Sequence, residues 1–362
     1  MSGIDVVGQD PRFGGGALAH MQAFVLAASE LGLDTELHYV PQPALRPEFD
    51  SDPLDRIEVL RVVRGGRRLA LSLGRPQPLW VVAPLATHGY AALRTGRPYA
   101  AWVGTSLADE NRGRLPGLPL SRALALRVNA PALARIECAV LRGASRVYAT
   151  SPSSRAAVAQ AARLDESVIG ILPLPVDVGQ FTPEDDDAWL RRLEQPVLAF
   201  VGRADDPRKN LGLALAALPL IRGRIPSATL RLIGRPPQQA LPEGVDVRGT
   251  VDAVAADLRE ASLLLLPARQ EGFGIVAAEA LAAGVPVVAT PSGGPEDLLV
   301  RSGGGIVLSG WQPEELANAV VELLGDAARL SAMRRSGREH VVREHSPERL
   351  RDLLEVAVAE TR

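Results

Sequence analysis

The sequence has little cysteine and no long uninterrupted apolar run. Its single cysteine, Cys138, rules out an intramolecular disulfide and a metal site built from several cysteines. One cysteine in 362 residues favours a reducing compartment. The longest apolar stretch, residues 273–290, contains Glu279, Gly284 and Pro286, which is not the pattern of a membrane-spanning helix. We therefore expect no transmembrane segment.

An excess of either charge is also lacking. With 40 basic and 42 acidic side chains the net charge is −2, which predicts no nucleic-acid partner. The first residues lack the basic start and apolar core of a secretory signal, so we expect a cytoplasmic protein. Peripheral contact with the inner face of a membrane through Arg64, Arg67 and Arg68 stays open, against the alternative that these arginines are only solvated.

Short apolar runs alternate with longer segments of helical period along the whole chain. The runs cover residues 4–7, 80–85, 146–149, 197–201, 229–233, 262–266 and 285–289. This alternation is typical of parallel sheets covered by helices, and the length suits about two domains. We predict an α/β protein with two Rossmann-like α/β/α domains.

The pattern is interrupted between Pro173 and Pro196 by prolines and the acidic run 185–187. Such a segment is typical of a crossing between domains. We place the first domain at 1–175, a linker at 176–194 and the second domain at 195–345. The last helix, about 346–362, is expected to pack back on the first domain.

Residues 57–74 differ from their surroundings. Two apolar runs flank Gly65-Gly66, which predicts a β-hairpin with the glycines in its turn. The neighbouring arginines would then lie around that turn.

The densest chemical signal is LLLLPARQEGFGIVAAEALAAGVPVVAT, where a buried strand, a glycine-rich turn and a helix beginning near Gly274 follow one another. Free backbone N–H groups at such a helix start, with the helix dipole, bind anions such as phosphate. Glu271 precedes the turn, and Glu279 lies within the otherwise apolar helix. A carboxylate there needs hydrogen-bond donors, and the hydroxyls of a sugar or a ribose are suitable ones. The alternative is that Glu279 lies on an exposed face or caps a neighbouring strand.

The same turn also spells Gly272-x-Gly274-x-x-Ala277, a form of the dinucleotide-binding fingerprint. NAD binding would require an acidic residue after the next strand. That strand ends in Thr290-Pro291-Ser292 without one, so an NAD-dependent dehydrogenase is the weaker alternative.

Two further segments could bind anions. VGRADDPRKN, residues 201–210, places Arg203, Arg208 and Lys209 on a loop after a strand, where they could hold a pyrophosphate. Because this loop and the glycine-rich turn both follow strands of one domain, we expect them to meet above one sheet edge; the alternative is a solvated basic loop. DPRFGGGALAH, residues 10–20, is another glycine-rich entry into a helix, or a plain turn.

These motifs together resemble the retaining GT-B glycosyltransferases of glycosyltransferase family four. The resemblance covers nearly the whole chain and is most specific from 197 to 295. It rests on Gly202-Arg203 with Lys209-Asn210, on Glu271 with Glu279 in the Glu-x7-Glu spacing, and on SGGPE at 292–296. The glycine loop at 14–16 and His20 also match.

The resemblance implies a GT-B fold, two domains facing across a cleft, and transfer of a hexosyl group from a nucleoside-diphosphate sugar to an acceptor hydroxyl with retention. The acceptor could be a glycan, a lipid or a small natural product. No metal and no cofactor beyond the donor sugar nucleotide would be needed. The resemblance also implies roles for single residues. Arg203 and Lys209 would neutralise the leaving diphosphate, Glu271 would touch the transferred sugar, and Glu279 would hold the ribose. Backbone N–H groups would come from Phe273, Gly274, Ile275 and Val276, and Gly15 and Gly16 would close the cleft from the other side.

One departure from the family pattern concerns the acceptor side. Where many relatives have a histidine, this chain reads Gly104-Thr105. The following polar residues 109–114 could form an acceptor wall or a solvated loop, and His88 could replace the histidine or serve packing. Three other functions stay open: a GT-B sugar phosphorylase, a nucleotide-sugar epimerase, and a non-catalytic partner that only binds a nucleotide sugar.

Overall fold

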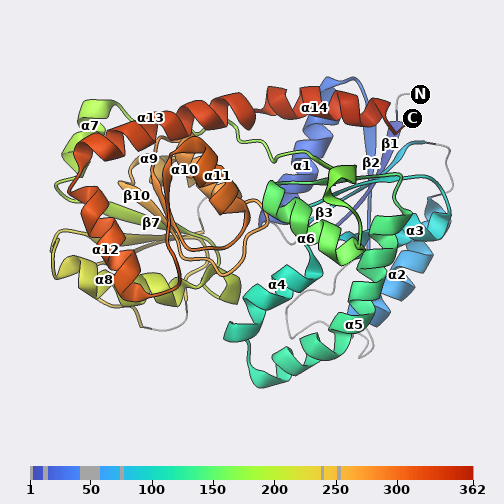
Figure 1. The fold of residues 1–362 in the computed structure, drawn as a ribbon, viewed down its shortest axis with the longest axis horizontal. Helices are drawn as coiled ribbons and strands as arrows, with labels where there is room; N and C mark the ends of the chain where they lie inside the picture. Colours follow the sequence, from blue (N-terminus) through green and yellow to red (C-terminus); the bar gives the residue numbers. More distant parts are fainter. Residues whose placement is uncertain are drawn as a thin grey trace. The chain divides into compact units, whose positions relative to one another are not determined.

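The computed structural model describes residues 3–10, 15–40, 58–73, 77–237, 240–250 and 254–361, with only the backbone for 15–17. The chain divides into two compact units. The first comprises Met1–Asn111, Leu118–Leu174 and Pro347–Arg362; the second comprises Arg112–Gly117 and Pro175–Ser346. Figure 1 shows the course of the chain through both units.

The first unit is built on a six-stranded parallel sheet in the order β2-β1-β3-β4-β5-β6. Its strands are β1 (Gly3–Gly8), β2 (Asp34–Tyr39), β3 (Leu79–Ala83), β4 (Ala100–Val103), β5 (Arg146–Ala149) and β6 (Ile169–Ile171). Its helices are α1 (Gly15–Glu30), α2 (Glu58–Ser72), η3 (Ala86–Gly89), α3 (Tyr90–Thr95), most of α4 (Leu107–Arg114), α5 (Leu120–Gly143), α6 (Pro152–Ala162), η5 (Glu166–Val168) and α14 (Pro347–Ala359). The central strands β3 and β4 are buried on both faces, as expected for a parallel sheet covered by helices.

The second unit contains another six-stranded parallel sheet, in the order β12-β11-β10-β7-β8-β9. Its strands are β7 (Val197–Val201), β8 (Thr229–Ile233), β9 (Val245–Gly249), β10 (Leu263–Leu266), β11 (Val287–Ala289) and β12 (Gly305–Val307). Its helices are η4 (Leu115–Gly117), α7 (Asp186–Arg192), η6 (Pro207–Lys209), α8 (Leu211–Arg222), α9 (Val254–Arg259), α10 (Ile275–Ala282), α11 (Gly294–Ser302), α12 (Pro313–Leu324) and α13 (Ala327–Glu344). The predicted α/β class with two Rossmann-like sheets is confirmed.

The strand order of the second sheet defines the place where ligands of such sheets bind. From β7 the chain continues to β8 and β9 on one side, and then returns to β10 on the other side of β7. The order therefore reverses between β7 and β10. Open α/β sheets bind ligands at the carboxyl ends of the strands on either side of such a reversal.

The predicted hairpin at 57–74 is wrong, because residues 58–72 of this segment form helix α2. Gly65 and Gly66 serve close packing and do not form a turn. A Cβ on Gly65 would lie 2.2 Å from a methyl carbon of Val40, and a Cβ on Gly66 would lie 2.7 Å from the ring of Tyr90. The glycine pair interrupts the apolar residues of this segment, so their helical spacing is not apparent from the sequence.

Three segments pack in a part of the fold that their positions in the sequence do not suggest. The predicted linker contains α7, whose Trp189 is fully buried in the core of the second unit beneath the guanidinium of Arg334. Residues 112–117 pack in the second unit, although they lie in the first half of the chain. The C-terminal α14 packs against α1 in the first unit.

None of the helices in the described ranges is long and apolar enough to span a membrane.

Candidate functional site

Two loops meet at the strand reversal of the second sheet. One follows β7 and runs through η6, and the other follows β10 and leads into α10. Since β7 and β10 are hydrogen-bonded neighbours, the two loops leave the same edge of the sheet side by side. The predicted convergence of these loops is found.

The strongest link between the loops is an ion pair. Lys209 Nζ donates a hydrogen bond to Glu271 Oε1 at 2.6 Å. Only 20% of the lysine side chain and 16% of the glutamate side chain are exposed. A partly buried ammonium is therefore held at the sheet edge by a single carboxylate oxygen, in the position where an anionic ligand could compete for it.

Arg203 and Arg208 belong to the same cationic loop and share one partner, Asp206. Arg203 Nη2 donates to Asp206 Oδ2 at 3.0 Å, and Arg208 binds both carboxylate oxygens, at 3.2 and 2.8 Å. Burial alone would raise the pKa of Asp206, but the hydrogen bonds and charge of Arg208, with the charge of Arg203, hold it well below its usual range. Asp206 therefore stays ionised and fixes the loop. Arg203 keeps about half of its side chain exposed and can reach a ligand.

Two hydrogen bonds to backbone carbonyl groups join the two loops. Arg269 N donates to Arg208 O at 2.7 Å, and Asn210 Nδ2 donates to Pro267 O at 3.1 Å. Asn210 adopts a left-handed conformation, with φ of 50°, between η6 and α8. Asparagine accepts this conformation more readily than most residues, which explains the sharp turn after Lys209.

The glycine-rich turn depends on two close approaches. Gly274 precedes α10 with φ of 80°, and a Cβ there would lie 2.5 Å from Pro295. A Cβ on Gly294 would lie 2.3 Å from the carbonyl oxygen of Gly272. Phe273 is buried with its ring edge-on to His345, at a centroid distance of 5.2 Å. Ile275 and Val276 form the first turn of α10, so their backbone N–H groups are at the positive end of the helix.

Glu279 lies one helical turn further along α10 and is partly buried. Burial raises its pKa to about 7, although the charge of Lys209 opposes the shift. In the part of the chain that the structure describes, no hydrogen-bond partner for its carboxylate is found. A ligand hydroxyl would supply the donor that an ionised Glu279 requires.

The two glycines predicted for the first unit open α1, which follows β1. Gly14 lies outside the described residues. His20, in the same helix, is buried and packs edge-on to Trp102 at a centroid distance of 4.1 Å. Burial lowers its pKa to about 3, so it is neutral at physiological pH. Whether Gly15 and Gly16 contact the donor stays a prediction.

Gly104-Thr105, the position where many relatives have a histidine, lies in a turn that hydrogen bonds hold in place. Gly104 O accepts hydrogen bonds from Ser154 Oγ at 2.6 Å and Thr150 Oγ1 at 3.2 Å, and Gly104 N donates back to the end of β3. The polar residues after it form α4, where Asp109 belongs to the first unit and Arg112 to the second. The polar residues at 109–114 are thus helical, and their contact with an acceptor stays a prediction.

His88 lies in η3, directly after β3, and is buried. Its Nδ1 is 3.0 Å from Leu85 O, which fixes the ring, and burial lowers its pKa. It lines a small hollow of the first unit together with Gly8, Arg61 and Tyr90. The backbone contact supports the packing role of His88.

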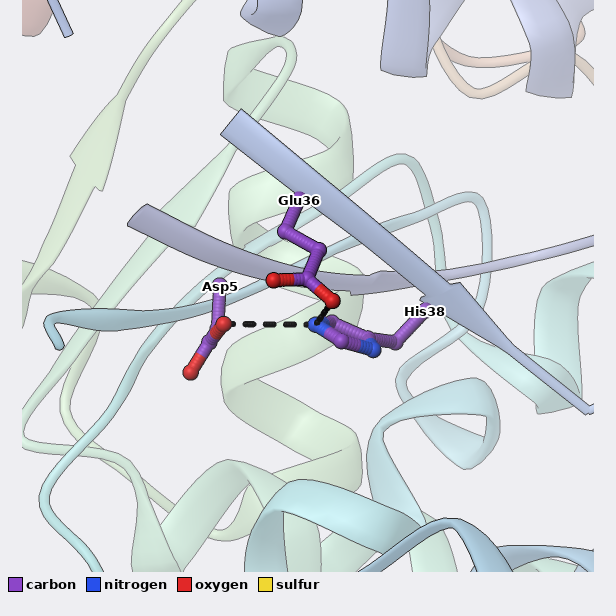
Figure 2. Close-up of side chains that lie close together, drawn as sticks. All are labelled: Asp5, Glu36 and His38. Carbon is purple, nitrogen blue, oxygen red and sulfur yellow. Dashed lines mark hydrogen bonds and ion pairs between the residues drawn. The ribbon is translucent and has the colours of Figure 1, made fainter. Parts of the chain in front are cut away.

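Another group of ionisable side chains lies on β1 and β2 (Figure 2). His38 Nε2 is 3.2 Å from Asp5 Oδ1 and 3.9 Å from Glu36 Oε1. Arg97 Nη1 donates to the other oxygen of Asp5 at 3.3 Å. The buried Asp5 therefore already has two partners, His38 and Arg97, and the group is accounted for as a hydrogen-bond network that joins the two strands.

Two residues that the sequence motifs did not single out shape the site: Asp206 and Arg269. The one sequence signal for Asp206 is its spacing, three residues after Arg203 and two before Arg208. Arg269 Nη2 donates to Asn210 Oδ1 at 3.3 Å, so its guanidinium braces the lysine-bearing loop. This contact joins residues 59 positions apart and has no local sequence signal.

Comparison with known proteins agrees with this geometry. Residues 195–326 match the family model described as glycosyl transferases group 1. D-inositol 3-phosphate glycosyltransferase from Segniliparus rotundus is 33% identical over 199 residues, 49% of this chain and 44% of that protein. GDP-mannose-dependent alpha-(1-6)-phosphatidylinositol monomannoside mannosyltransferase from Mycobacterium tuberculosis is 34% identical over 194 residues, 47% of this chain and 50% of that protein. The chain spans about half the length of these relatives.

The fold itself is matched over the whole chain. The solved structure of sucrose-phosphate synthase from Thermosynechococcus elongatus has a TM-score of 0.76 at 20% identity and covers 99% of each chain. At that identity the match establishes the fold. The resemblance to group 1 glycosyltransferases that the sequence motifs indicate is thus confirmed, and the fold is GT-B.

Proposed function

We propose that this protein is a retaining glycosyltransferase that moves a hexosyl group from a nucleoside-diphosphate sugar to an acceptor hydroxyl. The observation that carries the proposal is the meeting of Lys209 and Glu271 at the strand reversal of the second sheet. The pair brings together a cation that suits a diphosphate and a carboxylate that suits the hydroxyls of a sugar, which supports the proposal. The matching family model covers these same residues.

The site supplies positive charge where a leaving diphosphate would develop negative charge. In the proposed mechanism Lys209 exchanges its bond to Glu271 for a bond to a phosphate oxygen. Arg203, which Asp206 holds through Nη2, presents the exposed part of its guanidinium to the same group. Asp206 keeps the arginines oriented throughout, because its pKa lies well below neutral pH. Fixed charges of this kind stabilise the transition state without a protein nucleophile. With this much cationic charge from the chain, we propose transfer without a metal.

The donor would be held by the turn before α10. Phe273 and Gly274 precede α10, and Ile275 and Val276 form its first turn, so their backbone N–H groups lie at the helix start, where phosphate and sugar oxygens are favoured. Glu279 would accept hydrogen bonds from the ribose hydroxyls, and Glu271, once released by Lys209, from the sugar hydroxyls. The M. tuberculosis relative is named as GDP-mannose-dependent, so a guanosine donor is the first to test.

The reaction is tested by incubating the purified protein with GDP-mannose or UDP-glucose and a panel of glycan, lipid and small hydroxylated acceptors. We expect acceptor-dependent release of the nucleoside diphosphate and a product that keeps the anomeric configuration of the donor. Inversion of that configuration would contradict a retaining enzyme. Phosphorolysis, or epimerisation without acceptor, would replace the proposal by a phosphorylase or an epimerase. Donor binding without any turnover would indicate a non-catalytic partner protein.

We propose a cytoplasmic location for this reaction, because a chain with one cysteine suits a reducing compartment. Fractionation of the native cells with an antibody against the chain tests it. Recovery from the cytoplasmic side, free or membrane-bound, is expected, and recovery from an extracytoplasmic compartment would contradict it.

A further inference from the structure

A single ammonium group interacts with two carboxyl groups at the proposed donor site. Lys209 Nζ donates to Glu271 Oε1 at 2.6 Å, and both side chains are mostly buried. Burial raises the pKa of Glu279, and the charge of Lys209 acts against that shift. Lys209 therefore lies close enough to stabilise negative charge on both glutamates. An anionic ligand that binds this ammonium takes it away from Glu271.

Neither partner of the ion pair can move far from the other. The stem of Lys209 lies against Gly202, where a Cβ would be 3.4 Å from the lysine Cγ and Cδ atoms. The backbone of Glu271 is held on both sides, because its N–H donates to Ser292 O at 2.8 Å and its carbonyl oxygen accepts from Gly294 N at 3.1 Å. The carboxylate and the ammonium therefore stay within a side chain's reach of each other when a ligand binds.

A diphosphate and the Glu271 carboxylate compete for this ammonium, because each is an anion that binds a charged donor strongly. When Lys209 bonds to a phosphate oxygen, Glu271 keeps a mostly buried negative charge without its cation. Such a charge is costly unless other hydrogen-bond donors replace the cation. A ligand that supplies these donors avoids the cost, and a ligand without them binds more weakly.

The donor and the nucleotide product of the proposed reaction differ in this respect. The hexosyl group of a nucleotide sugar carries hydroxyl groups, which donate hydrogen bonds to a carboxylate. The nucleoside diphosphate that leaves after transfer has lost this group. Its terminal phosphate resembles a phosphate monoester with a second ionisation near pH 6, so at neutral pH it carries about one more negative charge than the donor. A neighbouring carboxylate therefore repels the product more strongly than the donor, and burial leaves this repulsion poorly screened.

We propose that Glu271 is the residue by which this site distinguishes the nucleotide sugar from the nucleoside diphosphate. While the sugar is present, its hydroxyls donate to Glu271, and Lys209 binds the diphosphate. Once the sugar has moved to the acceptor, Glu271 loses these donors and Lys209 returns to it, which favours release of the product. The inference rests on the proposed transferase function and adds selection between donor and product to it.

The test is isothermal titration of the full-length protein with GDP and GDP-mannose, and with UDP and UDP-glucose, in EDTA and without an acceptor. The measured quantity is the selectivity, defined as the affinity for the nucleotide sugar divided by the affinity for its nucleoside diphosphate. The variants are Glu271→Gln, which keeps the size of the side chain and removes its charge, and Glu271→Ala. The matched control is Glu322→Gln, which makes the same change at an exposed ion pair with Arg329. Circular dichroism checks that each variant is folded.

Glu271→Gln should bind the nucleoside diphosphate about tenfold more tightly, because a charged competitor for Lys209 is removed. Its affinity for the nucleotide sugar should not rise, since weaker hydrogen bonds to the sugar hydroxyls offset that gain. The selectivity should therefore fall about tenfold, and further in Glu271→Ala, while the control keeps the selectivity of the wild-type protein.

Unchanged selectivity in the folded Glu271 variants, or weaker binding of the diphosphate by them, would overturn the proposal and leave the donor site intact. Absence of binding of all four nucleotides to the wild-type protein would overturn the donor site itself, and this proposal with it.

Discussion

Lys209 and Glu271, 62 residues apart in the sequence, form an ion pair at the strand reversal of the second sheet, with 2.6 Å between Lys209 Nζ and Glu271 Oε1. Both side chains are mostly buried, so each leaves a poorly solvated charge when the other is removed. The pair links the two loops on which the proposed donor site depends.

We predict a positive coupling between these residues in a double-mutant cycle of unfolding. Lys209→Ala and Glu271→Ala should each destabilise the protein, and the double variant should be more stable than the sum of the single changes implies, by about 1–2 kcal/mol. Denaturant unfolding of the four proteins measures this. Additive effects would show that the ion pair is too solvated to organise the loops.

The second prediction concerns pH. Burial raises the pKa of Glu279 to about 7, and the ionised carboxylate accepts hydrogen bonds from a ribose with both oxygens and more strongly than the protonated form does. Nucleotide-sugar affinity should therefore rise about tenfold between pH 6 and pH 8, as the ionised fraction rises from about a tenth to about nine tenths. Titration calorimetry of the wild-type protein and Glu279→Gln checks it. The glutamine variant is the control, because any titration of the ligand is common to both proteins; an equal pH dependence in the two would contradict the role of Glu279.

Much of this fold could be predicted from local patterns. The apolar runs at 146–149, 197–201 and 229–233 coincide with β5, β7 and β8, because buried parallel strands are dense in apolar residues. The strand β9 was not predicted, since its VDVRG sequence is polar and lies at the sheet edge. α2 was misread because two adjacent glycines more often mark a turn than a helix contact. The candidate loops were found by their residue types, but the bond of Asp206 to both arginines and the pairing of Lys209 with Glu271 depend on tertiary structure.

The third prediction tests the turn before α10. Gly274→Ala places a Cβ in a left-handed conformation and 2.5 Å from Pro295, so it should destabilise the protein by about 2 kcal/mol or more and weaken donor binding. Gly212→Ala is the matched control, because its Cβ would have no atom within 4 Å and its helix favours alanine. Thermal unfolding and nucleotide titration of both variants provide the comparison. Equal behaviour of the two would mean that the turn tolerates a side chain and is not a tight anion cradle.

The fourth prediction concerns acid stability. Burial lowers the pKa of His20 to about 3, against 6.5 for an unperturbed histidine. The unfolded chain therefore binds a proton that the native state excludes, and stability falls as the pH drops below about 6.5. Between pH 7 and pH 5, protonation of this histidine in the unfolded chain should lower the free energy of unfolding by about 2 kcal/mol. His20→Phe keeps a ring against Trp102 and should lose this part of the acid dependence in urea unfolding at the two pH values. A variant as acid-sensitive as the wild type would assign the effect to other groups.

The central claim is that the loops at Arg203–Lys209 and Glu271–Val276 bind the diphosphate of a nucleotide sugar. It is tested most directly by isothermal titration of the purified protein with UDP, GDP, ADP and dTDP in the presence of EDTA, repeated on Lys209→Ala. We expect selective binding of one diphosphate without a metal, weakened about tenfold or more by the loss of the charged hydrogen bond. No binding of any of the four, or equal binding to the variant, would contradict the assignment of this site.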